Sequence, residues 1–383
     1  MPDDFSPEEL LRYSRQLVIP EVGLQGQSKL KAASVLIVGC GALGSIIAQY
    51  LAACGVGRIG LVDYDNIELS NLQRQVLYKT SLIGKPKVQT ARSLLLEINP
   101  EIRVDAYNEL FNSETAERIA EPYQIIVDGT DNIPTRYLMN DLCVFTHKPF
   151  VYGAVYRFEG QVGVFEATKG ACYRCVLPDP PPPELVPSCA TAGVVGAVPG
   201  IIGLYQATEV IKLILGIGTP LISQIMFFDA LASKTDRIRI PKNPHCKVCS
   251  KHPEVTHLID YEKFCNMSIR DNDVLIEAKH SISAKELDEV FSKGQDLHII
   301  DLREPVELQI SSFPHAENVP FNQLPAEMEK WGKTQPIVLV CHIGFLSGIA
   351  SRIMEEAGFT NVRCLKGGIR AWAKEVDAGM GLY

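Results

Sequence analysis

Three glycines and an aspartate have the types and spacing of a nucleotide phosphate site. Gly39, Gly41 and Gly44 follow G-x-G-x-x-G spacing, which permits a tight turn, a close backbone approach to a phosphate, and close packing of the next helix. Asp63 follows at about 20 residues, where an acidic side chain can reach ribose hydroxyls. These residues fit NAD, FAD or ATP, and a glycine turn without a ligand is the alternative.

A polar cluster follows this acidic residue. Ser70, Asn71 and Arg74 lie within LSNLQR, and Lys87 ends the sequence GKPK before an expected helix. Lysine and arginine placed after a nucleotide-binding unit can neutralise a triphosphate, and arginine can do so through two hydrogen bonds at once. The alternative is a charged surface loop.

The sequence DGTDN, residues 128–132, follows a short apolar run at 125–127. An aspartate at the carboxyl end of a parallel strand lies where α/β sheets bind ligands, and it can hold Mg²⁺ through oxygen. Alternatively, Asp131 caps the helix that we expect at 133–143. Asn132 lies beside it.

Two C-x-x-C turns supply four thiols. A tetrahedral zinc site uses four such sulfur ligands, and two turns of this spacing complete one site. The alternative is that the two turns are unrelated thiol pairs, or that one of them is a redox motif. We therefore predict a structural Zn²⁺ that links distant segments and supports folding, held by Cys172, Cys175, Cys246 and Cys249.

Two further cysteines have the surroundings of nucleophiles. Cys189 lies on a long loop between a run of four prolines and a glycine-rich stretch, and a thiol on such an arm can be delivered to a reactive intermediate. Cys341 lies between an apolar strand and a helix, where backbone N–H groups and the helix dipole stabilise a thiolate or persulfide. A passive Cys189 and an inert, buried Cys341 are the alternatives.

The elements that must position these residues form two α/β patterns. In the first, strands are predicted at 35–38, 59–62, 102–107, 125–127, 150–152, 161–165 and 224–229, and helices at 7–18, 25–33, 45–53, 88–98, 113–119, 133–143 and 201–215. In the second, strands are predicted at 297–300, 336–340 and 362–365, and helices at 284–291, 348–357 and 368–374. We predict a Rossmann-like domain at 1–260, a linker at 261–275 and a small α/β domain at 276–383.

The totals describe a globular protein of two or three domains. The 383 residues carry a net charge of −8, which argues against sequence-independent nucleic-acid binding. The first residues are acidic and polar, so no secretory signal is expected, and the eleven cysteines favour metal ligands and reactive thiols in the cytoplasm. The uncharged stretch 190–208 is interpreted as a buried loop and helix rather than a membrane span.

Taken together, these motifs resemble a known family. The first two-thirds of the chain resembles the MoeB/ThiF family, the bacterial relatives of ubiquitin-activating enzymes, through RYSRQ, GCGALG, LSNLQRQ, GKPK, DGTDN and the two C-x-x-C turns. The last hundred residues resemble a single rhodanese domain through DLREP, the Cys341 loop and LKGGIRAW. The fusion is similar to the molybdopterin-synthase adenylyltransferase/sulfurtransferase type, which includes the MoeZ proteins.

The resemblance implies ATP with Mg²⁺ rather than NAD. It implies that Asp63 binds the ribose, that Asn71, Arg74 and Lys87 contact the phosphates, and that Asp131 holds Mg²⁺. It also implies that Arg15, which spacing alone would leave as a solvated residue, reaches into the ATP site of the partner in a homodimer. The four C-x-x-C cysteines match the family's zinc ligands, Cys189 its mobile-loop cysteine, and Cys341 the rhodanese persulfide cysteine.

Two departures from the family pattern stand out. Ala42 replaces a common glycine in the phosphate loop, although the three glycines of the motif remain. The rhodanese loop has His342, Phe345 and Leu346 where many have arginine or other polar residues. The less cationic loop disfavours thiosulfate as the sulfur donor and favours a persulfide donor such as a cysteine desulfurase.

The expected reaction is ATP-dependent adenylation of the C-terminal glycine of a ubiquitin-fold sulfur carrier ending in Gly-Gly. Sulfur from a persulfide on Cys341 then gives a thiocarboxylate for molybdopterin, a thionucleoside or cysteine. The alternative is a carrier-activating enzyme for protein conjugation, with a thioester on Cys189 and a regulatory rhodanese domain. An adaptor without catalysis is disfavoured by Lys87, Asp131 and Cys341, and an NAD dehydrogenase by the lack of a hydride-transfer site.

Overall fold

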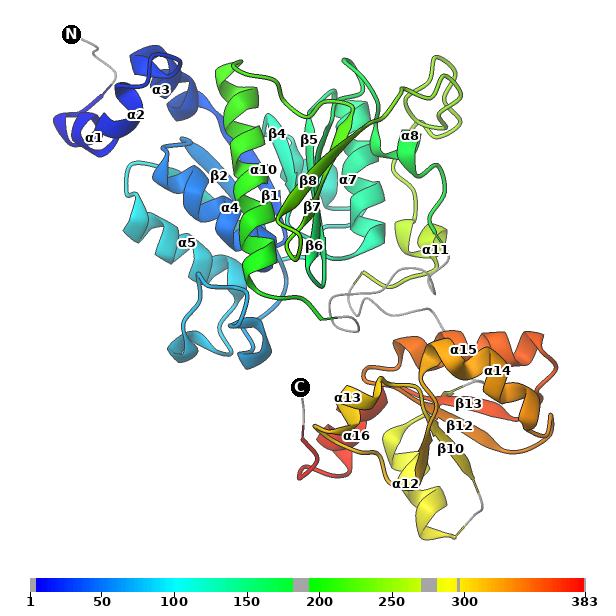
Figure 1. The fold of residues 1–383 in the computed structure, drawn as a ribbon. Coiled ribbons are helices and arrows are strands. Elements are labelled where there is room, and N and C mark those ends of the chain that lie inside the picture. Colours follow the sequence, from blue (N-terminus) through cyan, green and yellow to red (C-terminus); the bar gives the residue numbers. More distant parts are fainter. Residues whose placement is uncertain (1–4, 182–192, 270–280, 295–296, 382–383) are drawn as a thin grey trace. The chain divides into compact units, whose positions relative to one another are not determined.

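The computed structural model describes residues 5–181, 193–269, 281–294 and 297–381. These residues form two compact units, the first ending at Cys265 and the second beginning at Asn266 (Figure 1). Each unit has its own sheet and its own apolar core.

The first unit is built on an eight-stranded sheet in the order β3-β2-β1-β4-β5-β6-β7-β8. The pairings from β3 to β5 are parallel, and those from β5 to β8 are antiparallel. The strands are β1 (Ser34–Val38), β2 (Arg58–Val62), β3 (Arg103–Tyr107), β4 (Ile125–Asp128), β5 (Phe150–Tyr156), β6 (Glu159–Phe165), β7 (Gln224–Asp229) and β8 (Lys234–Arg239).

Helices cover this sheet and supply most of its core partners. Helix α4 packs against α5 and α10, and α10 also packs against β5 and β6 (Figure 1). Helices of more than seven residues are α3 (Gly23–Ala32), α4 (Ala42–Ala53), α5 (Lys87–Ile98), α7 (Ile133–Thr146) and α10 (Ala197–Leu215), and shorter ones are α1 (Pro7–Arg12), α2 (Ser14–Leu17), α6 (Ala116–Ala120), α8 (Tyr173–Val176) and α11 (Tyr261–Cys265). Short 3₁₀ turns are η1 (Leu69–Asn71) and η2 (Thr80–Leu82).

The long apolar helix α10 is the one element of the described chain with the length and composition of a membrane span. In the structure it packs against α4 and two strands, and Ile202, Ala207 and Val210 are buried there. Such packing is that of a core helix, and it accounts for the apolar composition of α10.

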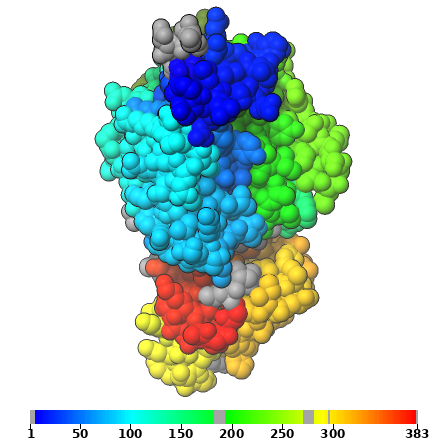
Figure 2. Space-filling model, turned by 90° about the vertical axis from the view of Figure 1, so that its left-hand side faces the viewer, coloured from blue at the N-terminus to red at the C-terminus, as the bar shows by residue number. Residues whose placement is uncertain are grey.

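The N-terminal residues depart from the predicted single helix at 7–18. The chain forms α1 and α2 with a break at Tyr13, whose buried hydroxyl accepts a hydrogen bond from Asn99 Nδ2 at 2.8 Å. A capping box between Ser6 and Glu9 begins α1. These helices lie at the surface of the first unit, where Figure 2 shows them in dark blue.

The predicted linker starts at residue 261, but the structure places residues 261–265 in the first unit as helix α11. This helix packs on α7, and the buried Tyr261 hydroxyl donates to Asp141 Oδ2 at 2.8 Å. The first unit therefore extends to Cys265. The remaining domain boundaries stay a prediction.

The second unit contains a five-stranded parallel sheet in the order β11-β10-β12-β13-β9. Apolar residues line both faces of its central strands, as expected for a sheet covered by helices on both sides. The strands are β9 (Ser281–Ile282), β10 (His298–Asp301), β11 (Ala316–Asn318), β12 (Ile337–Val340) and β13 (Val362–Leu365); the helices are α12 (Ala284–Ser292), α13 (Pro305–Leu308), α14 (Leu324–Glu327), α15 (Phe345–Glu356) and α16 (Gly368–Glu375), with 3₁₀ turns η5 (Phe321–Gln323) and η6 (Met328–Lys330).

Candidate active site

The glycine loop lies at the point where the strand order of the first sheet reverses, between β1 and β4. Gly39 follows β1 with a φ of +92°, and a side chain there would place its Cβ 2.7 Å from the Gly129 carbonyl oxygen. A Cβ on Gly44 would overlap the Gly39 carbonyl oxygen, so α4 packs directly on the loop. Around Gly41 the nearest atom to such a Cβ is 3.7 Å away. The loop therefore leaves its backbone approachable at a position where open α/β sheets bind ligands.

Asp63 follows β2 and is tied to the glycine loop. Its Oδ2 accepts the Cys40 backbone N–H at 2.8 Å, and its Oδ1 accepts the Asp65 N–H at 2.8 Å. Burial raises the pKa of the Asp63 carboxyl, and the Lys87 charge opposes that change. The carboxylate is held by backbone groups at the edge of the loop.

Lys87 begins α5 and points its ammonium group to the same edge. Lys87 Nζ lies 2.8 Å from Asp65 Oδ2, and the lysine side chain is 6% exposed. Burial by itself lowers the pKa of this lysine, but Asp63 and Asp65 outweigh it and the pKa is raised. Lys87 is therefore a cation at neutral pH, and the carboxylates of Asp63 and Asp65 stabilise its charge.

The polar cluster at 70–75 forms a 3₁₀ turn and its continuation. Asn71 Oδ1 accepts the Glu68 N–H at 3.1 Å, and Arg74 Nη1 donates to the Ser70 carbonyl oxygen at 2.9 Å. Gln75 is buried, and its Oε1 has no hydrogen-bond partner among the described residues. A buried amide oxygen without a hydrogen-bond partner destabilises the folded protein. A bound ligand that donates a hydrogen bond to Gln75 Oε1 would remove this cost.

The DGTDN segment separates two acidic residues with different surroundings. Asp128 ends β4, is fully buried, and accepts hydrogen bonds from Thr130 and Arg136. Asp131 is exposed. Asn132, and not Asp131, caps α7, with its Oδ1 accepting the Thr135 N–H at 2.9 Å. The capping alternative for Asp131 is therefore wrong, and Asp131 is an exposed carboxylate at this edge of the sheet.

The four cysteines of the two C-x-x-C turns converge, and their sulfur atoms lie within 4.8 Å of one another. The Cys172–Cys246 separation is 3.6 Å, Cys175–Cys249 is 3.5 Å and Cys172–Cys175 is 3.9 Å. A tetrahedron of sulfur ligands at zinc bond lengths has edges of about 3.8 Å. These residues therefore fit a metal of the zinc type, as the sequence predicts.

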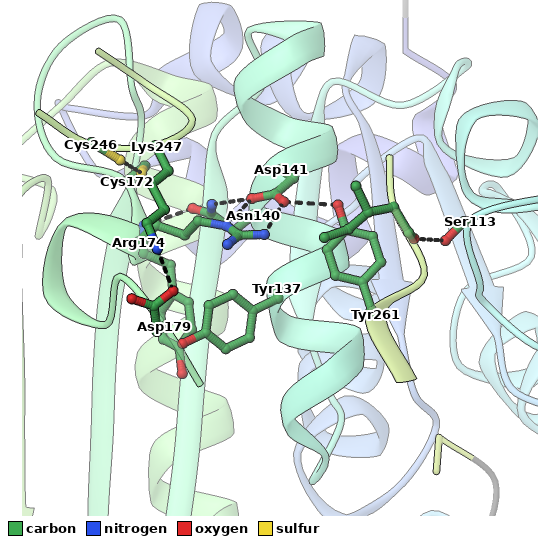
Figure 3. Close-up of polar contacts among 12 residues, drawn as sticks. Ser113, Tyr137, Asn140, Asp141, Cys172, Arg174, Asp179, Cys246, Lys247 and Tyr261 are labelled. Atoms are coloured by element: carbon green, nitrogen blue, oxygen red, sulfur yellow. Dashed lines mark hydrogen bonds and ion pairs between the residues drawn. The ribbon is translucent and has the colours of Figure 1, made fainter. Parts of the chain in front are cut away.

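A buried polar network joins this cysteine cluster to α7 (Figure 3). Arg174, between Cys172 and Cys175, donates to both carboxylate oxygens of Asp141, at 2.9 Å and 2.6 Å. The Arg174 and Asp141 side chains are 1% and 0% exposed. Asn140 Oδ1 accepts the Tyr173 N–H at 2.7 Å. The cluster is thus built into the first unit and distant in sequence from the nucleotide-site residues.

Of the two predicted sulfur nucleophiles, the structure describes only Cys341. Cys189 lies outside the described residues. Cys341 follows β12, and its Sγ accepts the Gly344 N–H at 3.2 Å and the Ser347 N–H at 3.4 Å, with the Ser347 hydroxyl also 3.4 Å away. The neighbouring segment holds this loop, because Ile369 N–H donates to the Cys341 carbonyl oxygen at 2.9 Å.

The electrostatic state of Cys341 results from two opposing effects. The backbone N–H groups are present at the start of α15, and they lower the thiol pKa. Burial has the larger effect, so the pKa of Cys341 is raised above its ordinary value. The loop is arranged to hold a sulfur anion once it forms, but it does not lower the pKa of the thiol below its ordinary value.

Several residues at the site were not predicted from the sequence. Asp65 pairs with Lys87, Gln75 presents an unpartnered oxygen, and Arg136 pairs with Asp128. Polar type alone did not distinguish them from surface residues, and their contacts cross between elements. Arg15 is an exposed residue of α2, and its predicted role in a partner subunit stays a prediction.

Comparison with known proteins gives the same two-part architecture. Residues 13–248 match the ThiF family and residues 283–375 match the rhodanese-like domain. A relative named adenylyltransferase and sulfurtransferase MOCS3 from Drosophila yakuba is 42% identical over 388 residues, covering 98% of this chain and 85% of the relative. The protein of the same name from Sus scrofa is 40% identical, covering 99% of this chain and 88% of that protein.

Solved structures resemble the first unit. The crystal structure of E. coli MccB with ATP has a TM-score of 0.56 and 27% identity, covering 62% of this chain and 74% of that one. The crystal structure of E. coli MccB with MccA-N7isoASN has a TM-score of 0.56 and 26% identity, covering 63% of this chain and 75% of that one.

The fold and the site define an α/β nucleotide-site domain followed by a domain with a cradled cysteine. The chain belongs to the ThiF family and ends in a rhodanese-like domain. It is an enzyme of the adenylyltransferase and sulfurtransferase class.

Proposed function

We propose that this enzyme uses ATP to adenylate the C-terminal glycine of a ubiquitin-fold sulfur carrier ending in Gly-Gly, and then converts that carboxylate into a thiocarboxylate. The observation that carries the proposal is the presence, in one chain, of an open glycine loop beside Lys87 and of Cys341 in a cradle of N–H donors. One site suits phosphate chemistry and the other suits sulfur transfer.

In the adenylation step, different residues at the edge of the first sheet bind the ribose, the metal and the phosphates of ATP. Asp63 binds the ribose hydroxyls, and Asp131 would hold a Mg²⁺ ion, which would supply positive charge to neutralise the phosphates. Asn132 lies beside this metal position. The glycine loop and the polar cluster receive the phosphates through Gly39, Gly41, Gly44, Ser70, Asn71, Arg74 and Lys87.

The first chemical step is an attack by a carrier carboxylate oxygen on the α-phosphorus of ATP. The bond from that phosphorus to the bridging oxygen breaks, and pyrophosphate leaves with the electron pair. Lys87 and Arg74 stabilise the charge that develops on the phosphates, so the protein acts through positioning and electrostatics. The product is an acyl-adenylate, in which AMP is a good leaving group.

The second step brings sulfur to the activated carbonyl. The terminal sulfur of a persulfide on Cys341 attacks the carbonyl carbon, AMP leaves, and an acyl disulfide forms. A thiolate on Cys189 then attacks the Cys341 sulfur, releasing the carrier thiocarboxylate and leaving a Cys189–Cys341 disulfide that a cellular dithiol reduces. In the alternative order, Cys189 first forms a thioester with the carrier and releases AMP.

Further expectations complete the proposal. Zn²⁺ in the four-cysteine cluster has a structural role, since all four ligands are protein thiols and no position is open for substrate. The enzyme acts in the cytoplasm as a homodimer in which Arg15 reaches the partner's nucleotide. A cysteine desulfurase supplies the persulfide, because the loop around Cys341 lacks the cations that would attract thiosulfate.

The test of the adenylation step is ATP–pyrophosphate exchange in the presence of a Gly-Gly carrier. Asp131→Ala should reduce exchange by at least a hundredfold, while Cys341→Ala should retain the wild-type rate. Full exchange in the Asp131→Ala variant would contradict the metal assignment. Loss of exchange in Cys341→Ala would contradict the separation of the two chemical steps.

Detection of the products separates this proposal from protein conjugation. Thiocarboxylate formation requires the persulfide on Cys341, whereas conjugation would yield carrier–lysine adducts that form without it. Such adducts in a reaction with Cys341→Ala would favour the conjugating enzyme.

A further inference from the structure

A buried ion pair lies directly beneath the loop that carries Asp131. Asp128 ends β4 and Arg136 is the fourth residue of α7, and Arg136 Nε donates to Asp128 Oδ2 at 2.9 Å. Their side chains are 0% and 10% exposed. Two charges taken this far from water are costly unless additional hydrogen bonds satisfy them, so the groups that complete the network are informative.

Most of those groups belong to Thr130 of the DGTDN loop. Thr130 donates its N–H and its hydroxyl to Asp128 Oδ1, at 2.9 Å and 2.7 Å. Arg136 Nη2 donates to the Thr130 carbonyl oxygen at 3.1 Å and to the Gly153 carbonyl oxygen of β5 at 3.3 Å. Thr130, the residue immediately before Asp131, is therefore fixed by hydrogen bonds at its backbone N–H and at its carbonyl oxygen.

The same loop is in contact with the phosphate loop. A Cβ on Gly39 would lie 2.7 Å from the Gly129 carbonyl oxygen, and a Cβ on Gly129 would lie 3.0 Å from Gly44 Cα. The Asp128 carbonyl oxygen also accepts a hydrogen bond from Gln206 Nε2 of α10 at 2.7 Å. The position of this loop therefore sets both the direction of Asp131 and the packing of the glycine loop.

We propose that Arg136 is a positioning residue for the metal–phosphate half of the site. It holds the Thr130 carbonyl so that Asp131 faces the phosphates of ATP at the glycine loop. The inference rests on the proposed function, because it assumes that Mg²⁺-ATP binds at this edge. Arg136 itself touches neither nucleotide nor metal.

The planar guanidinium explains why arginine is needed here. Nε faces the carboxylate while Nη2 serves two carbonyl oxygens, in directions that one rigid fork can satisfy. A lysine keeps the charge that Asp128 requires, but its single nitrogen cannot reproduce that arrangement. Arg136→Lys therefore separates neutralisation of Asp128 from positioning of Thr130.

The chain offers a matched control in the Arg174–Asp141 pair (Figure 3). This pair is also buried, and its guanidinium donates two hydrogen bonds to the carboxylate, but it joins α7 to the cysteine cluster rather than to the loop. Arg174→Lys should perturb a buried ion pair without moving Thr130.

The experiment titrates ligand binding by calorimetry in the full chain, using AMP without metal and the non-hydrolysable ATP analogue AMPCPP with Mg²⁺. In Arg136→Lys, AMP affinity should stay within twofold of wild type, while AMPCPP affinity falls at least fivefold and the Mg²⁺ concentration for half-maximal exchange rises at least fivefold. Arg174→Lys should leave all three values within twofold.

Equal losses for AMP and AMPCPP in Arg136→Lys, no loss for either, or the same selective loss in Arg174→Lys would overturn the inference. If Arg136→Lys does not fold, Thr130→Val removes one hydrogen bond to Asp128 and should show the same selectivity, and its absence there would also overturn the inference. A wild-type protein that does not bind Mg²⁺-AMPCPP would overturn the proposed function, whereas normal binding with unselective variants would overturn this inference alone.

Discussion

At the level of single residues, Cys341 combines two opposing influences. Two backbone N–H donors, from Gly344 and Ser347, and the Ser347 hydroxyl surround its sulfur, yet the sulfur is almost completely buried. Burial disfavours the charged thiolate more strongly than these donors favour it, so the pKa is raised. In the proposed function, a persulfide would place its outer sulfur one bond further from the backbone than Sγ, so the cradle would act on that intermediate rather than on the resting thiol.

This state predicts the pH dependence of Cys341 alkylation. Below the pKa, the thiolate fraction increases about tenfold per pH unit. Because the pKa is raised, the rate constant with iodoacetamide should keep increasing through the ordinary titration range of a thiol, without a plateau between pH 7 and pH 9. Mass spectrometry of the peptide that contains Cys341 measures the rate.

Ser347→Ala supplies the comparison for this prediction. The substitution removes the hydroxyl that lies 3.4 Å from the sulfur, so the pKa should rise further and alkylation at pH 8 should become slower. A plateau below pH 8 in the wild-type protein, or faster alkylation in the variant, would contradict the assignment.

At the level of elements, α4 and the glycine loop form one packing unit. A Cβ on Gly44 would overlap the Gly39 carbonyl oxygen, so Gly44→Ala must displace the helix or the loop. Overpacking of this kind costs about 1–3 kcal/mol, and urea unfolding should show that loss together with weaker ATP binding. Wild-type stability in this variant would contradict the assigned packing.

Gly200 in α10 is the matched control, because no atom lies within 4 Å of a Cβ built there. Alanine restores helix propensity without a clash, so Gly200→Ala should stabilise the first unit by about 0.5–1 kcal/mol. A comparable loss in both variants would show that general sensitivity to alanine, and not the contact with Gly39, causes the effect.

Local patterns predicted the elements that hold the nucleotide site. The strand of four apolar residues at 35–38 and the three glycines specify their own turn, and β1 and α4 form there. The same holds for β12 and the Cys341 loop. In these places the local preference agrees with the fold, which is the condition under which sequence patterns succeed.

Other features depend on contacts between elements. The break at Tyr13 follows from its hydrogen bond with Asn99, 86 residues away. Strand β8 was not predicted, because its six residues, KTDRIR, are all exposed and mostly charged, and only pairing with β7 reveals them as a strand. The sequence predicts Arg136 only as a residue of a helix, because its contact with Asp128 depends on the fold.

At the level of the whole molecule, the two units have separate cores, and the cysteine cluster that fits a metal lies in the first unit. The cysteine cluster joins turns that are 74 residues apart in the first unit. Differential scanning calorimetry should therefore show two transitions, and a zinc chelator should lower only the transition of the first unit.

The size of that shift follows from the role of the metal. A structural metal contributes its binding energy to folding, and a loss of about 3 kcal/mol lowers the midpoint by roughly 6–12 °C for a unit of this length. Cys172→Ser should reproduce the shift without chelator, and Cys341→Ala should not. A single chelator-independent transition would contradict the assigned metal site.

The most direct test of the central claim is the mass of the carrier after reaction with enzyme, ATP and a persulfide donor. Replacement of one carboxylate oxygen by sulfur adds about 16 Da. The wild-type enzyme should produce this gain, and Cys341→Ala should produce none while it retains ATP–pyrophosphate exchange. Full conversion of the carrier by the Cys341→Ala variant at the wild-type rate would contradict the account.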